Sequence, residues 1–142
     1  MRASGLFGML MAAAVGMAGV SAQAQVVVIL SSKNPISKLT PDQVAQVFLG
    51  QAKTFYTGGL CEPVDQAEGA AVRTEFYQKV TGKNAAQMKA YWAKLTFSGN
   101  GQPPQSVANG EALVKLVAEN PKFIGYVDKA LVNTSVKIVL AP

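Results

Sequence analysis

Blocks of apolar residues alternate with amphipathic segments along this chain, and the alternation predicts strands separated by helices. Residues 26–30 form an unbroken run of valine, isoleucine and leucine, which is typical of a strand covered on both faces. We therefore predict a central strand there. Residues 60–64 indicate a short second strand, and the apolar runs 123–127 and 136–140 indicate two more.

Four helices are predicted between these strands from their start signals and apolar spacing. The first begins after Thr40, with Pro41 at the first helical position and Gln43 completing a capping box. The second covers about residues 70–80, and the third and fourth begin at Asn84 and Asn109. The expected buried positions are Val44, Val47 and Phe48; Val72, Phe76 and Val80; Met88, Tyr91 or Trp92, and Leu95; and Leu113, Leu116 and Val117.

Strands that alternate with helices predict an α/β layered sheet. The glycine- and proline-rich residues 97–104 between the third and fourth helices form either a functional loop or a simple connector.

The first 24 residues have the three parts of a signal peptide. A positive start with Arg2 is followed by an apolar stretch over residues 6–20, and Ala22-Gln23-Ala24 supplies a small-x-small cleavage site. The alternative is a retained membrane anchor. We expect cleavage after Ala24, a periplasmic product with no membrane span, and a single domain over residues 25–142.

Composition narrows the possible chemistry. The formal charge is +5 and the lysines are scattered without a basic run, which does not suggest nucleic-acid binding and favours small anions or envelope surfaces only weakly. The chain contains no histidine and only one cysteine, so it lacks the residues of the usual transition-metal or Cys/His catalytic sites, and no cofactor is expected. Cys61 is either a buried bystander or a reactive thiol.

The turn between the predicted strand at 60–64 and the next helix is the candidate binding site. A glycine-containing strand-to-helix turn can hold an anion with backbone N–H groups, because a helix N-terminus carries unpaired donors and partial positive charge. Gly69 provides the turn, and Arg73 is the one guanidinium nearby. Its alternative role is a surface ion pair or a lid over Tyr77. Asp65 and Glu68 are expected to serve as a cap or a solvated turn, not as a catalytic pair.

Two segments resemble a known family. Residues 38–50 are similar to the LT-x-x-x-(V/L)-x-x-IF-x-G segment of periplasmic phosphate-binding proteins of ABC importers, and residues 123–127 look like their IGYV strand. Residues 73–76 and 91–104 are similar to runs in small, single-lobe exported members of the type II periplasmic-binding-protein superfamily. The resemblance implies a three-layer α/β sandwich with a mixed, mostly parallel sheet, like the middle lobe of the phosphate-binding proteins.

The family's ligand loop carries over only in part. Counted back from Phe76, its arginine falls on Gln66 and its Ser-Gly-Thr on residues 70–72, which are Ala70, Ala71 and Val72 here. Gly69, the backbone N–H groups and Arg73 remain. The resemblance therefore implies a non-enzymatic exported domain that binds a small, phosphate-like anion together with a second copy or an envelope partner.

The alternative function is a protein-interaction or regulatory domain of the envelope that has lost ligand binding. Exposed Phe55, Tyr56 and Trp92 would be its signature, although such aromatic residues are more often core.

Overall fold

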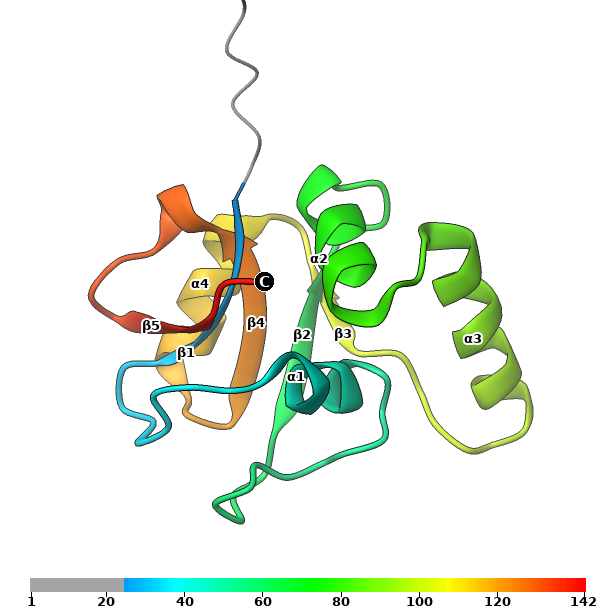
Figure 1. Cartoon of the computed structure of the whole chain (residues 1–142), viewed down its shortest axis with the longest axis horizontal. Coiled ribbons are helices and arrows are strands. Elements are labelled where there is room, and N and C mark those ends of the chain that lie inside the picture. The colour runs from blue at the N-terminus through cyan, green and yellow to red at the C-terminus, as the bar shows by residue number, and fades with distance from the viewer. Residues whose placement is uncertain (1–24) are drawn as a thin grey trace, which may run out of the picture.

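The computed structural model describes residues 25–142, so the predicted signal peptide lies outside the described residues. Within them the first strand, β1 (Val26–Ser31), is buried along its whole length. It is hydrogen-bonded to β4 (Phe123–Asp128) on one side and to β5 (Val136–Leu140) on the other (Figure 1). The prediction of a central strand is therefore confirmed.

The remaining strands extend the sheet beyond β4. The order is β3-β2-β4-β1-β5, with β2 (Glu62–Gln66) parallel to β4 and to β3 (Gln105–Val107). Because β1 is antiparallel to both of its neighbours, it alone runs against the other four strands of this sheet. The sheet is thus mixed and mostly parallel, as predicted.

Three helices begin where their capping residues predict. Thr40 and Asn84 each form a full capping box, and Asn109 accepts a hydrogen bond from the Ala112 N–H. The helices are α1 (Pro41–Phe48), α2 (Ala71–Thr81), α3 (Ala85–Phe97) and α4 (Gly110–Glu119), followed by a short 3-10 turn, η1 (Lys129–Leu131).

Alternate residues of the central strand face two different cores. Val28 and Leu30 pack with side chains of α1, α2 and α3, whereas Val27 and Ile29 pack with those of α4. The fold therefore has three layers, with α4 alone on its face of the sheet (Figure 1). Gly125 permits the close approach of α4, because a Cβ there would lie 2.5 Å from a methyl carbon of Leu113.

Two expectations need correction. The second strand starts at Glu62 and continues to Gln66, two residues later than predicted at each end. The strand at 105–107 was not predicted, because this three-residue segment is largely exposed and shows no apolar run. It joins the sheet through backbone pairing with β2.

The third helix is attached by few side chains. Met88 and Trp92 are buried, whereas Tyr91 and Leu95 are only half-buried. Figure 1 shows α3 set apart from α1, α2 and the sheet. Phe97 at its end is 96% exposed.

Candidate functional site

The turn from β2 to α2 has the backbone of an anion-binding loop but no capping side chain. Gly69 has φ +91°, a left-handed conformation that favours glycine, and open space surrounds the position of its missing Cβ. The N-cap of α2 is Ala70, which offers no side-chain hydrogen bond to the helix. The donors at this helix start are therefore its first backbone N–H groups.

The five predicted site residues lie in this turn but do not all face one point. Gln66 is buried at the end of β2, and its Nε2 donates to the backbone oxygen of Tyr126 at 2.9 Å. Its amide is therefore committed to β4. Gly69 and Ala71 are exposed, Ala70 is half-buried, and Arg73 is the one charged side chain among the five.

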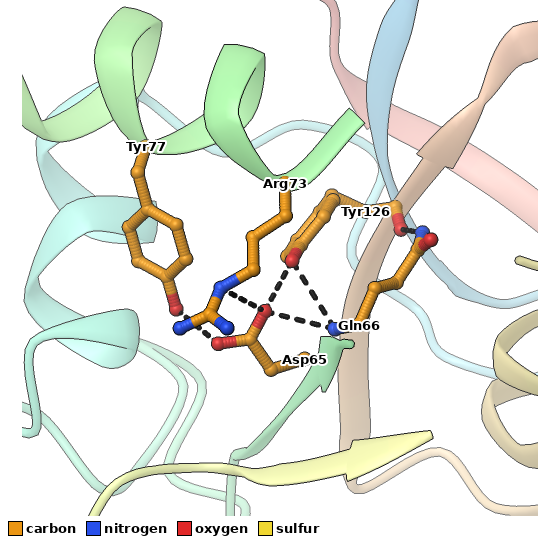
Figure 2. Close-up of polar contacts among 5 residues, drawn as sticks. All are labelled: Asp65, Gln66, Arg73, Tyr77 and Tyr126. Carbon is orange, nitrogen blue, oxygen red and sulfur yellow. Dashed lines mark hydrogen bonds and ion pairs between the residues drawn. The ribbon is translucent and has the colours of Figure 1, made fainter. Parts of the chain in front are cut away.

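A buried polar cluster lies beneath the first turns of α2, centred on Asp65 (Figure 2). The Tyr77 hydroxyl donates to Asp65 Oδ2 at 2.5 Å, and the Tyr126 hydroxyl donates to Oδ1. The Gln66 N–H also donates to Oδ1, at 2.8 Å. Arg73 Nε lies 3.6 Å from the same oxygen and completes an ion pair. Within residues 25–142, no buried side-chain nitrogen or oxygen is without a hydrogen-bond partner.

This cluster corrects the interpretation of Asp65 as a cap or part of a solvated turn. Asp65 lies in β2 and is only 4% exposed, because three donors and a guanidinium replace its water. Glu68, by contrast, is exposed in the turn. The two carboxylates therefore occupy different environments.

Aromatic packing holds the two tyrosines in place. The rings of Tyr126 and Phe76 stack with centroids 4.1 Å apart and planes 6° apart. Tyr77 packs edge-on against Phe76 at 5.1 Å. Burial raises the pKa of both tyrosine hydroxyls, and the negative charge of Asp65 raises each pKa further. Both tyrosines therefore remain protonated donors at neutral pH.

Arg73 has one of the roles considered from sequence, that of a lid over Tyr77. It pairs with Asp65, which is buried, so the pair is not the surface ion pair that was expected; its guanidinium carbon lies 5.6 Å from the centre of the Tyr77 ring and covers this tyrosine. Its side chain remains 24% exposed. The carboxylate faces Nε, and no second ion pair of Arg73 occurs within the described part of the chain.

A pocket of about 160 Å³ opens beside Arg73, between α2 and α3. Its charged lining side chains are Arg73, Lys89 and Glu68, and its buried lining side chains are Tyr77, Met88, Trp92. Lys89 takes part in none of the ion pairs formed within residues 25–142. The pocket therefore combines two cationic groups with an apolar wall.

Sequence reasoning missed three members of the buried cluster, Asp65, Tyr77 and Tyr126. The available signal was weak. Asp65 follows the short strand that was predicted at 60–64. Tyr77 lies four residues after Arg73, so the side chains of Arg73 and Tyr77 lie on one face of α2. Tyr126 is separated from both by about fifty residues or more, and the sequence gives no sign of that contact.

No group of residues 25–142 combines three metal-ligating side chains. None of the helices described here has the length and apolar character needed to cross a membrane.

Comparisons with known proteins identify the fold. No protein-family model matches the sequence, and no curated protein matches it. Solved structures do match. One is a putative phosphate ABC transporter substrate-binding protein with bound phosphate from Clostridium perfringens, with TM-score 0.65 and 22% identity over 81% of this chain and 44% of that chain. Another is an ABC-type phosphate transport receptor from Vibrio cholerae, with TM-score 0.64 and 16% identity over 81% of this chain and 45% of that chain.

A third match is PstS from Borrelia burgdorferi, with TM-score 0.61 and 12% identity, over 81% of this chain and 46% of that chain. At these identities the likeness establishes the fold alone. The described residues have the α/β fold of the lobes of phosphate ABC transporter substrate-binding proteins. The chain spans less than half the length of these structures.

Proposed function

We propose that this protein is a non-enzymatic, exported solute-binding-protein-like domain that supplies half of a binding site for a small anion. The observation that carries the proposal is the position of Arg73. It lines a pocket beside the turn that follows β2, on a fold shared with phosphate ABC transporter substrate-binding proteins. In open α/β sheets, ligands bind outside the carboxyl ends of the strands, and this turn lies at such an end.

The pocket is large enough for a small anion but too small for a larger ligand. Sites for drug-sized ligands usually enclose about 300 to 1,000 Å³, whereas this pocket has a volume of about 160 Å³. The matched structures are more than twice as long as the part that this chain covers. A second copy or an envelope partner would therefore supply the facing surface.

Asp65 fixes the cationic group of the half-site. Because the carboxylate is held by two tyrosine hydroxyls and a backbone N–H, it is a rigid partner for Arg73 Nε. A guanidinium has five N–H donors, so the contact with Nε leaves the terminal nitrogens for a ligand. The export of this domain to the periplasm is the part of the proposal that rests on residues 1–24.

A thermal-shift screen of the purified mature protein against inorganic phosphate, sulfate and nitrate tests the proposal. Ionic strength is held constant with chloride. A ligand at one hundred times its dissociation constant adds about 2.7 kcal/mol to the free energy of unfolding. We expect stabilisation by at least one oxyanion, and its loss in Arg73→Ala. The absence of an Arg73-dependent shift with every anion, at protein concentrations up to the millimolar range, contradicts the proposal.

The alternative is an envelope interaction domain that has lost ligand binding. The exposure of Phe97, Tyr56 and Leu60, at 96%, 63% and 52%, favours this alternative. Phe55 and Trp92 are both buried, so only Tyr56 remains of the three aromatic residues first expected on the interaction surface. Sedimentation of the wild type and of Phe97→Ser distinguishes self-association through the end of α3 from a monomer.

A further inference from the structure

The pocket between α2 and α3 has two unlike ends. Arg73 and Lys89 are the cationic side chains of its lining, and Met88 and Trp92 form a buried apolar wall. We propose that this pocket binds a small organic anion, with its charged head at Arg73 and Lys89 and a short hydrocarbon tail against Met88 and Trp92. The inference rests on the proposed function and names the chemical class of the ligand.

Charge at the open end favours an anionic head. Arg73 and Lys89 contribute two positive charges to the lining, and Glu68, exposed in the turn, contributes one negative charge. Asp65 belongs to the buried cluster and faces Nε of Arg73. Lys89 is an exposed side chain of α3 and Arg73 belongs to α2, so the two cationic groups line the pocket from different helices.

The apolar wall is rigid, which makes it suited to a hydrocarbon tail. Trp92 is 7% exposed, and a Cβ at Gly50 would lie only 3.1 Å from its ring, so the glycine backbone supports the indole closely. Met88 beside it is 1% exposed and packs in the core. An inorganic oxyanion would leave the part of the apolar lining that is still accessible in contact with water, whereas a short alkyl group would cover it.

Trp92 is the only tryptophan of the chain, so its fluorescence reports directly on the pocket. We would titrate the mature protein with acetate, propanoate and butanoate at constant ionic strength. A saturable change in Trp92 emission is expected. Each added methylene should tighten binding about threefold to fourfold, because burying one is worth about 0.8 kcal/mol. Butanoate should therefore bind about tenfold more tightly than acetate. Neither 1-butanol nor butylamine should match it.

Two lysines of α3 provide a matched pair of variants. Lys89→Met should weaken butanoate binding at least threefold, whereas Lys94→Met, on the same helix but outside the pocket lining, should leave it unchanged. Arg73→Ala should abolish the response. Because Arg73 also contacts Asp65, Arg73→Lys is the second variant, and it should retain part of the binding.

The outcomes separate the two proposals. Equal affinities for acetate and butanoate, or equal effects of the two lysine variants, overturn the organic-anion inference. If inorganic phosphate then still stabilises the protein through Arg73, the proposed function stands without this inference. If no anion gives an Arg73-dependent response in either fluorescence or melting, both proposals fail.

Discussion

Removal of the Asp65 carboxylate tests the buried cluster beneath α2 most directly. The Asp65 oxygens accept hydrogen bonds from Tyr77, Tyr126 and the Gln66 N–H, and they pair with Arg73. In Asp65→Ala, two buried tyrosine hydroxyls lose the acceptor of their protons, and Arg73 loses its partner.

The expected cost follows from these contacts. A buried donor without a partner costs about 1 to 3 kcal/mol, and two hydroxyls are affected. Arg73 adds little to this cost, because its side chain is 24% exposed and water can solvate the guanidinium once its partner is gone. We expect Asp65→Ala to lower the free energy of unfolding by about 3 to 5 kcal/mol. Asp65→Asn should cost about 2 kcal/mol, because its neutral side chain still pairs with the tyrosines but forms weaker hydrogen bonds.

Urea denaturation followed through Trp92 fluorescence measures both values. Asp42→Asn is the control, since Asp42 is exposed in the first turn of α1 and should cost less than about 1 kcal/mol. A double-mutant cycle with Tyr77→Phe should give a coupling of about 0.5 to 3 kcal/mol. A cost below 1 kcal/mol for Asp65→Ala, or no coupling to Tyr77, would refute the cluster as the support of Arg73.

Four further predictions concern single groups. Arg73→Ala should lower the free energy of unfolding of the ligand-free protein by only about 1 kcal/mol or less, because Asp65 keeps its three hydrogen-bond donors and the ion pair it loses is long, at 3.6 Å, and partly exposed; a larger loss in urea denaturation would make Arg73 chiefly structural. Calorimetry at low salt should show that the monomer binds phosphate with a dissociation constant above about ten micromolar, since the family's Arg, Ser and Thr donors are absent at Gln66, Ala70 and Val72; tighter binding contradicts this. Above pH 10, Tyr77 and Tyr126 lose their protons in the unfolded state but retain them in the folded state, so the free energy of unfolding should fall as the pH rises further. Denaturation at several pH values should show a shallower fall for Tyr77→Phe. Burial raises the pKa of Cys61 to about 12, and the negative charge of Glu62 adds to the shift. The alkylation of Cys61 at pH 8 should therefore be about a thousandfold slower in the folded protein than in the urea-unfolded protein, and equal rates would show that the thiol is accessible.

The sequence predicted the elements whose signals are local. The capping boxes at Thr40 and Asn84 require residues only three positions apart, and both helices begin there. The apolar run at 26–30 predicted a strand with two covered faces, and β1 has them. Local chemistry therefore determines where these elements begin and how they are buried.

The parts that sequence reasoning missed depend on contacts between distant segments. The β3 strand exists because the β2 backbone offers a parallel partner, and its own residues are largely exposed. Asp65 is buried because the Tyr126 hydroxyl reaches it from β4, 61 positions away in sequence. A carboxylate in a turn is indistinguishable in sequence from a carboxylate at the buried end of a strand until that partner is known.

The cluster also explains how one arginine could serve a site without the Arg, Ser and Thr donors of the phosphate-binding loop that it resembles. An exposed arginine is flexible and gains little from a small anion, because ordering its side chain costs entropy. Here Asp65 and the Tyr77 ring already hold the guanidinium before any ligand arrives. That order is maintained by tyrosines that stay protonated at neutral pH and by rings packed against Phe76. The Asp65 carboxylate also neutralises part of the positive charge of Arg73, so a bound anion must gain the rest of its affinity from other groups. Lys89 and the apolar wall at Trp92 are the groups of the pocket that can provide this additional affinity. The affinity for organic anions, more than the affinity for phosphate, therefore distinguishes a ligand-binding domain from an interaction domain that has lost its ligand.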